Sequence, residues 1–329
     1  MGRERLRFEA IIGRFLRHLR GRLEAERGAA PEQVVLGRPV RFVDEADRQA
    51  EAQLEAAARM EGFRHVEFQF EPVAAALSHE RAIGAEQLAL VVDIGGGTSD
   101  FSVLRLSPER ARRADRLDDI LSTAGVHIGG TDFDRQFSIA RVMPHLGLGS
   151  STLDGKRRLP VWYFKDMATW HRINTLYTQR NAGDIRMLLR QAAEPEKLER
   201  YAHLLRHRSG HRLAAEVETA KIALTGTEAT TIALREPGLT LEVPATRAEF
   251  EAASRDLVRR IGASIDDTLG QAGIGADAIE TVILTGGGVQ VPAVEKAATA
   301  RFGHARMSRS DRFGSVGLGL AIDAARRFG

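Results

Sequence analysis

The order of apolar and polar residues predicts short strands that alternate with helices in the first 84 residues. Apolar positions recur at helical spacing within the first 28 residues, and we interpret this segment as a helix docked on the protein surface. Asp44 is the expected cap of a second helix. The further elements predicted here are strands over residues 32–40 and 65–70 and helices over residues 44–63 and 71–82.

Two strands joined by a glycine-rich turn come next. Residues 88–93 are a continuous apolar run, residues 100–106 alternate between apolar and polar, and residues 119–128 suggest a third strand. These three strands would form part of one sheet.

The segment after these strands predicts a helix. Thr131 and Asp134 stand near the spacing of a capping box, in which two residues satisfy each other's free backbone groups. Phe133, Phe137 and Ala140 would share the buried face of this helix.

Residues 144–211 are less regular and hold both tryptophans. We interpret them as an inserted helical subdomain that extends to about residue 246. The elements expected after it alternate again, which implies an α/β protein with mixed sheets. They are helices over residues 214–224 and 247–270, a hairpin over 230–243, a strand over 281–285, and helices from 292 and over 314–328.

The composition of the chain excludes several classes of function. The chain has no cysteine, so disulfides and thiolate metal sites are impossible, and a reducing cytoplasm is compatible. Its 47 basic residues are balanced by 44 acidic ones to a net charge of +3, without the signature of nucleic-acid binding. No apolar run approaches the roughly 20 residues that span a bilayer. We expect a cytoplasmic protein with neither nucleic acid nor a membrane as partner.

Three glycine-rich turns carry the candidate chemistry: residues 95–97, 129–130 and 286–288. Such turns can bind phosphate through their backbone N–H groups because glycine has no Cβ to keep a ligand away. The first turn leads into a strand, whereas Walker and dinucleotide-binding loops lead into a helix. The Thr98 hydroxyl would assist it. The other two turns lead into helices, whose N-termini favour anions.

Asp93 and Asp100 flank the first turn. Carboxylates beside a phosphate repel it unless a cation lies between them, so the pair predicts Mg²⁺, held largely through water. Glu71, at the end of another strand, would face the same cleft and orient a water molecule. The alternatives are a wide hairpin turn with two solvated aspartates, and for Glu71 an ordinary acid at a helix start.

Three histidines at four-residue intervals, His203, His207 and His211, would line one helical face and could hold a metal ion. The surrounding arginines favour a solvated basic face instead.

Four motifs, in this order, together resemble the Hsp70 branch of the actin-like ATPases: FQFEPVAAAL, VVDIGGGTSDFSVL, HIGGTDFD and VILTGGGVQVPAV. The insert with its tryptophans is similar to that of the short bacterial Hsp70-like proteins of the YegD type. The resemblance implies an actin/Hsp70-like ATPase fold, in which Mg-ATP binds between two ribonuclease H-like lobes with mixed sheets. Residues 1–84 would belong to the first lobe and residues 85–329 to the second, with the inserted subdomain at about 144–246.

The resemblance also implies a role for each motif around ATP or ADP and Mg²⁺. The catalytic groups would be Asp93 and Asp100, which hold the hydrated metal, and Glu71, which orients water. The residues expected at the β- and γ-phosphates are Gly95, Gly96, Gly97 and Thr98, with Gly129 and Gly130 near the phosphates or the ribose. Adenosine would lie against Gly286, Gly287 and Gly288, with Glu218 and Lys221 on the opposite wall.

The sequence departs from the Hsp70 pattern in three respects. Ile222 and Gln290 stand where Hsp70 proteins carry an arginine against the adenine, so weaker base contacts are expected. No first phosphate loop of the Asp-x-Gly-Thr-Thr type or catalytic lysine precedes Val34, so we expect an incomplete first lobe, a truncated chain and impaired ATP hydrolysis. No peptide-binding domain precedes the last residue, so clients and co-chaperones are implied by the family alone.

Two other functions share some of these motifs. Actin-like filament proteins of the MreB kind carry similar EPxAAA, VDIGGGT and LTGGG stretches, and sugar or acid kinases share the superfold. The insert with its tryptophans favours the chaperone branch.

Overall fold

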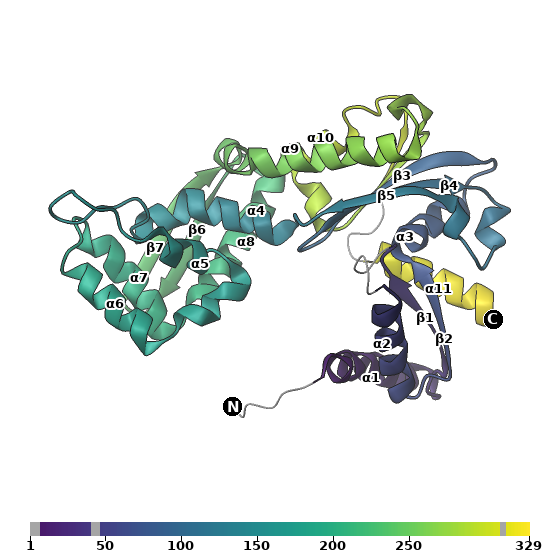
Figure 1. Ribbon diagram of the computed structural model, residues 1–329, viewed down its shortest axis with the longest axis horizontal. Helices are drawn as coiled ribbons and strands as arrows, with labels where there is room; N and C mark the ends of the chain where they lie inside the picture. Colours follow the sequence, from purple (N-terminus) through teal and green to yellow (C-terminus); the bar gives the residue numbers. More distant parts are fainter. Residues whose placement is uncertain (1–6, 41–46, 310–313) are drawn as a thin grey trace.

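The computed structural model describes residues 7–40, 47–309 and 314–329, which form a main sheet, a small sheet, a hairpin and surrounding helices (Figure 1). Asp44, the expected cap of the second helix, lies outside the described residues. The helices are α1 (Phe8–Arg27), α2 (Asp47–Met60), α3 (Glu71–Glu80), α4 (Gly130–Phe137), α5 (Val161–Met167), α6 (Gln179–Leu189), α7 (Pro195–His207), α8 (Gly210–Gly226), α9 (Arg247–Ala272), α10 (Pro292–Thr299) and α11 (Ser315–Phe328).

The main sheet has the strand order β5-β4-β3-β8-β9. Its centre, β3 (Gln87–Ile94), pairs antiparallel with β4 (Ser99–Leu106) and parallel with β8 (Thr281–Thr285). The edge strands are β5 (Ile120–Val126), antiparallel to β4, and β9 (Arg306–Arg309), parallel to β8. The sheet is therefore mixed, which confirms the expected α/β class.

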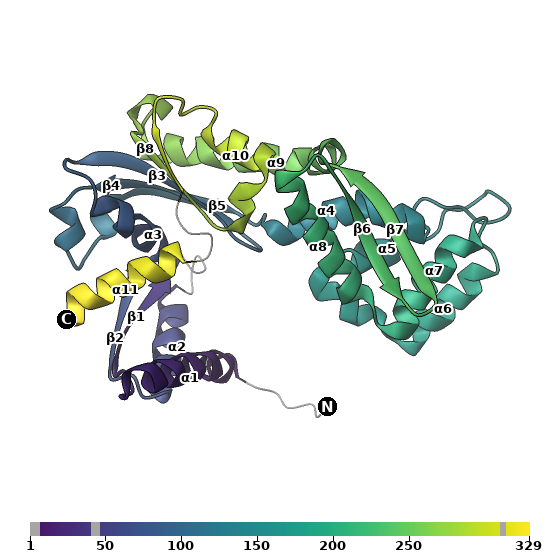
Figure 2. The ribbon, with the colours of Figure 1, turned by 180° about the vertical axis from the view of Figure 1, so that it is seen from behind.

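Helices cover both faces of the main sheet (Figure 2). Side chains on β3 alternate between two cores because successive residues of a strand point to opposite faces. Leu90 and Val92 pack in the large core with α9, whereas Ala89 and Val91 pack in a second core with Val73 of α3. Helix α9 begins where predicted, because the Thr246 hydroxyl and the side chain of Glu249 form a capping box.

The small sheet pairs β1 (Gln33–Arg38) with β2 (His65–Phe70) in parallel. Helices α1 and α2 pack on it through Leu16, Ala58 and Phe63, as expected for a docked first helix. Most of the apolar face of α1 does not take part, and Phe8 and Phe15 are each 63% exposed.

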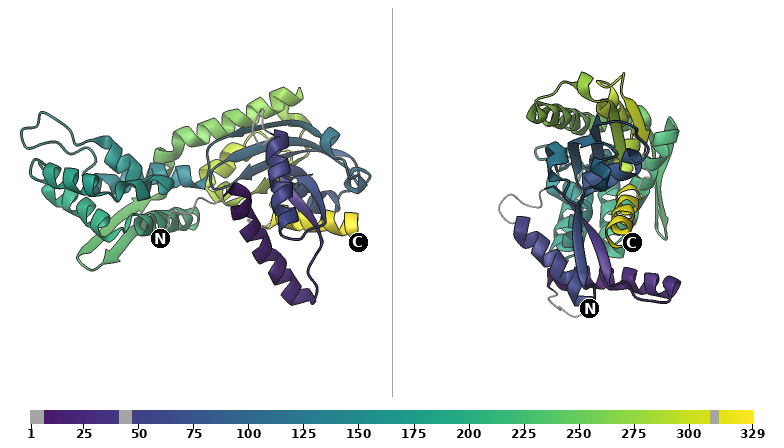
Figure 3. Two further views of the ribbon diagram at one scale, coloured as in Figure 1. Left: turned by 60° about the horizontal axis from the view of Figure 1, so that its bottom comes forward. Right: turned by 90° about the vertical axis from the view of Figure 1, so that its right-hand side faces the viewer.

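Helix α11 lies between the main and the small sheet (Figures 1 and 3). It packs against both α3 and β1. At the crossing with α3, a Cβ on Gly319 would lie 1.8 Å from the Ala74 carbonyl oxygen, so only glycine allows this approach.

Some elements differ from the prediction. Helix α4 continues as a π-helix over Ser138–Val142, whose wider turn leaves Ala140 exposed while Phe133 and Phe137 are buried as expected. The cap of α4 is the Gly129 N–H bonded to the Asp132 carboxylate at 3.0 Å, not Thr131 with Asp134. Strand β9 was not predicted because its sequence, RMSR, has a single apolar residue.

The insert lies beside the main sheet and consists of α5–α8 and a hairpin of β6 (Ala229–Glu236) and β7 (Leu239–Thr246) (Figure 1). Its three histidines do not share one helix, because α7 ends at His207 and His211 belongs to α8. The His203 ring is buried 2.9 Å from the Glu236 carboxylate, so this is not a solvated face either. Throughout the described ranges, no group of three or more histidine, aspartate or glutamate side chains is placed to hold a metal ion.

A buried ion cluster joins α3 to the loop before β5. The Arg116 guanidinium is fully buried and donates to both oxygens of the Glu80 carboxylate, at 2.9 and 2.8 Å, and to Asp119. Glu80 also accepts the Ser107 N–H at 2.9 Å. Every charge in this cluster therefore has an opposite partner.

We predict that Arg116→Ala lowers the free energy of unfolding by about 3–5 kcal/mol, because two carboxylates lose their buried partner. Urea denaturation measures the difference. Arg259→Ala is the control, since Arg259 is 75% exposed and pairs with an exposed Asp256, and it should cost less than about 1 kcal/mol. Equal losses in the two variants would contradict the structural role of Arg116.

Candidate functional site

The turn between β3 and β4 presents free backbone donors. The Gly95 N–H donates to the Thr98 carbonyl at 2.9 Å, which closes the turn. In the part of the chain that the structure describes, no acceptor takes the N–H groups of Gly96, Gly97 or Thr98, and all three residues are exposed. Three consecutive free N–H groups form a concave, partly positive surface suited to an anion.

The second glycine turn holds the first in place. The Gly130 N–H donates to the Gly95 carbonyl and the Thr131 N–H to the Gly96 carbonyl, both at 2.9 Å. A Cβ on Gly129 would lie 2.4 Å from the backbone of Gly96 and Gly97. The N–H groups of Gly129 and Gly130 already have acceptors, so these residues position the loop, and their nearness to a ligand stays a prediction.

The third glycine turn approaches the end of β3. Gly286 has a φ of 83°, and a Cβ there would lie 2.3 Å from the Ile94 carbonyl oxygen. A Cβ on Gly288 would lie 2.3 Å from the Ile94 side chain. Glycine is required at both positions, because β8 runs parallel to β3 and its turn must cross the strand end closely.

A hollow of about 350 Å³ joins the three turns to α8. Glu218 and Lys221 line it from α8, together with Ile222, whose side chain is 55% exposed, and Gln290 lies on the other side. The sequence thus located nearly all of this lining, which includes Gly95, Gly96, Gly130, Gly286, Gly287 and Gly288.

Lys221 has a partner that the sequence analysis did not find. Its ammonium group lies 2.8 Å from the Asp134 carboxylate and donates to the Gly130 carbonyl at 3.2 Å. Burial raises the pKa of Asp134 to about 6, although Lys221 opposes the shift. Asp134 stands in the HIGGTDFD motif, and this position was the signal that could have identified it.

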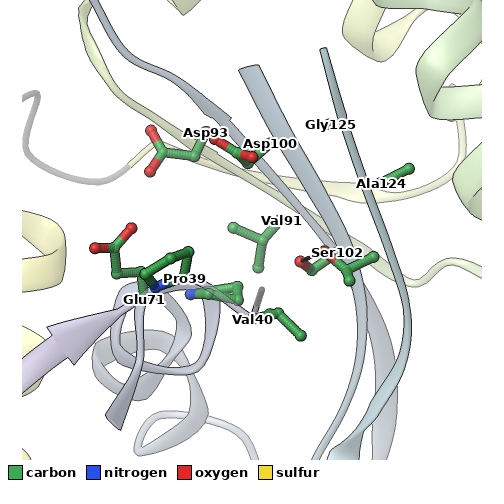
Figure 4. A pocket seen from close by; sticks show the side chains of 11 residues that line it. Pro39, Val40, Glu71, Val91, Asp93, Asp100, Ser102, Ala124 and Gly125 are labelled. Atoms are coloured by element: carbon green, nitrogen blue, oxygen red, sulfur yellow. Dashed lines mark hydrogen bonds between the residues drawn. The ribbon is translucent and has the colours of Figure 1, made fainter. Parts of the chain in front are cut away.

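A second hollow, of about 240 Å³, brings three carboxylates together (Figure 4). Asp93 and Asp100 are direct partners in the β3–β4 register, and Glu71 faces them from the start of α3. Pro39 and Val40 line the same space from the end of the small sheet. Residues far apart in the sequence thus converge here, as predicted for Glu71, Asp93 and Asp100.

These carboxylates disfavour each other's charge. Burial, and then the charge of Asp100, raise the pKa of Asp93 to about 6. Burial raises the pKa of Asp100 as well, while a hydrogen bond from Thr98 and the charge of His127 oppose the shift. The pKa of Glu71 is raised by burial and by both aspartates. The charges of Asp93 and Asp100 are therefore coupled, although Asp100 is exposed.

The donor set fits a hydrated Mg²⁺ ion. Carboxylate oxygens are the ligands this cation prefers, and it usually keeps several waters. Asp93 and Asp100 offer such oxygens beside the free N–H groups of the first turn. A cation there would relieve the repulsion that raises the pKa of Asp93.

A family model described as "Hsp70 protein" matches residues 1–143 and 190–328. The chain belongs to the Hsp70 family. It is 31% identical over 322 residues to the chaperone protein DnaK of Thermotoga neapolitana. The aligned residues cover 96% of this chain and 44% of that protein. It is 28% identical over 307 residues to the chaperone protein HscA of Pectobacterium carotovorum, with 93% and 39% covered. This Hsp70 protein thus spans less than half the length of these relatives.

Family membership and the mixed sheet with helices on both faces identify the actin/Hsp70-like ATPase fold. The comparisons do not favour the filament protein or the kinase, and similarity to the YegD type stays a prediction. Residues 144–189 of the insert lie outside the family match. Among the described residues, no helix has the length and apolar character needed to cross a membrane.

We predict that Asp93→Asn stabilises the metal-free protein by about 1–3 kcal/mol at pH 8, because the variant removes a repelled, buried carboxylate. The folded-state pKa of Asp93, about 6, exceeds its ordinary value of 3.8, so the folded state binds the proton more tightly. Wild-type stability should therefore rise as the pH falls from about 7 to 5, and the advantage of the variant should shrink.

Urea denaturation in EDTA at several pH values measures both effects. A constant difference between the two proteins from pH 8 to pH 5 would contradict the assignment of Asp93 as the repelled group.

Proposed function

We propose that this chain is an Hsp70-like nucleotide-binding domain that binds ATP or ADP with Mg²⁺ and hydrolyses ATP slowly. The observation that carries the proposal is the free N–H triplet of Gly96, Gly97 and Thr98 beside Asp93 and Asp100. An anion site and a cation site in contact are what a metal-bound phosphate chain requires.

Each wall of the site has a distinct task in this proposal. The N–H triplet would bind the β- and γ-phosphates, and Asp93 and Asp100 would hold Mg²⁺, which supplies charge neutralisation when bound. The hollow between the third turn and α8 would take adenosine, with Lys221 as part of its wall. The ion pair with Asp134 fixes the Lys221 ammonium in place.

Glu71 is positioned to orient water. It begins α3, where Pro72 in the first turn fits the helix without a lost hydrogen bond. Its carboxylate faces Asp93 and Asp100 across the carboxylate hollow (Figure 4). A bound cation would lower the raised pKa of Glu71 and keep it ionised, and only the ionised form is free to accept a proton from water.

The wider role is inferred from the relatives. The similar proteins carry the name chaperone protein, and we propose that this protein acts in a cytoplasmic chaperone. Client and co-chaperone proteins would be its partners, and nucleotide its ligand.

We predict that Mg²⁺ raises ADP affinity about tenfold or more in the wild-type chain and much less in Asp93→Asn, because one metal-directed carboxylate is lost. Isothermal titration calorimetry with MgCl₂ or EDTA measures this dependence. Asp256→Asn is the matched control, since that aspartate is 81% exposed on α9. Unchanged Mg²⁺ dependence in Asp93→Asn would reject the metal role.

The base contact gives a separate prediction. Ile222→Arg should tighten ADP binding about fivefold, because a planar guanidinium can stack on the adenine. Ile222→Lys places the same charge without the planar group and should gain less. Calorimetry on both variants tests the placement of the base, and the absence of any gain with arginine would show that the adenine does not lie against α8.

A further inference from the structure

A groove of about 630 Å³ lies between α6 and α7, at the end of the molecule farthest from α11 (Figure 1). It is separate from the two hollows of the nucleotide site. Helix α6 belongs to the segment 144–189, which the family match does not include. The groove is therefore partly built from residues outside the family match.

Three arginines line this groove, and none has an acidic partner. Arg186 comes from α6, Arg206 from α7, and Arg208 from the residue after α7. The lining includes no aspartate or glutamate, and among the described residues no carboxylate pairs with these guanidinium groups.

Some other arginines of the same subdomain are paired. Arg212 lies 2.6 Å from Glu236, and Arg235 lies 2.6 Å from Glu242. The groove thus collects positive charge that the protein itself does not neutralise.

Arg208 is held at the groove in an unfavourable backbone conformation. Its φ of 52° is the one positive value of a non-glycine residue in the described ranges, at a helix C-cap where glycine is usual. Its guanidinium lies over the Tyr177 ring, 5.7 Å from the centroid. The Tyr177 hydroxyl accepts the Gly210 N–H at 3.0 Å, which fixes the ring. An arginine at this position strains the backbone, and its side chain lines the groove.

Apolar side chains form part of the groove floor. Leu176, Ile185 and Leu205 are buried beneath it, so the half-buried Ala182 and Ala202 supply its accessible apolar surface. The groove volume of about 630 Å³ far exceeds that of a small inorganic anion, which would occupy only the space beside the arginines. An extended acidic peptide with apolar side chains would contact the arginines and this alanine surface together.

We propose that this groove binds an acidic peptide segment with apolar side chains, supplied by a partner protein. The three guanidinium groups would pair with its carboxylates, and its apolar side chains would cover the floor between α6 and α7. This activity goes beyond nucleotide binding and does not depend on it.

Fluorescence polarisation of a labelled Glu-Leu-Glu-Asp-Leu-Glu peptide with the full chain, without nucleotide, tests the proposal. Arg186→Ser and Arg206→Ser should each weaken binding about fivefold, and 0.5 M NaCl should weaken it further. Arg208→Gly should weaken binding equally while its unfolding midpoint is no lower than that of the wild type, because glycine relieves the strain. Arg190→Ser, an exposed change at the end of α6 outside the groove, should bind as the wild type does.

Several results would overturn the proposal. These are a wild-type dissociation constant above about 1 mM, equal binding of a peptide with lysine in place of each acid, or an equal loss in Arg190→Ser. Displacement of the peptide by pyrophosphate at matched ionic strength would assign the groove to small anions instead.

Discussion

The close approach of two glycine turns is the constraint on which the site depends. Because Gly129 has no Cβ, the start of α4 lies directly on the backbone of Gly96 and donates two backbone hydrogen bonds to that turn. Helix α4 then places Phe137 against Phe250 of α9, with ring centroids 5.1 Å apart. It also carries Asp134 to Lys221 of α8. One helix therefore fixes the turn between β3 and β4 relative to the core, to α8 and to the insert.

The protein places its clustered carboxylates in two kinds of surroundings. Glu80 and Asp119 surround Arg116, and each has an opposite charge in contact. Asp93 faces Asp100 instead, and the raised pKa of Asp93 reflects its partial burial and the repulsion by Asp100. The same residue type stabilises the fold in the first cluster and destabilises it in the second. In the proposed function, a bound cation would supply the missing charge at this pair, so part of the folding free energy would be exchanged for affinity.

The sequence was sufficient to locate the turns and acidic residues of the candidate site, but not the contacts that hold them in place. Periodicity and turn residues located β3, β4 and the turn between them, and the register that makes Asp93 face Asp100 follows from a short hairpin. The resemblance to Hsp70 proteins supplied Glu218 and Lys221, whereas the third glycine turn was visible in the sequence itself. Contacts between distant segments, such as that of Arg116 with Glu80, could not be predicted from the sequence.

Local irregularities of the backbone were not predicted, for a related reason. The π-helix over Ser138–Val142 keeps the apolar spacing of an ordinary helix at its start, and only packing reveals the wider turn. Strand β9 exists because β8 offers a free edge, since its own residues have weak strand preference. The left-handed conformation of Arg208 contradicts its residue type, and no pattern rule predicts it.

The place of α11 sets an order of events during synthesis. This helix packs against α3 and β1 through a glycine contact at Ala74. A ribosome completes α3 and the small sheet long before it makes residues 315–328, so their shared surface stays uncovered while the main sheet, the insert and α9 emerge. The packing of the first part of the chain is therefore completed only when the last helix has been made.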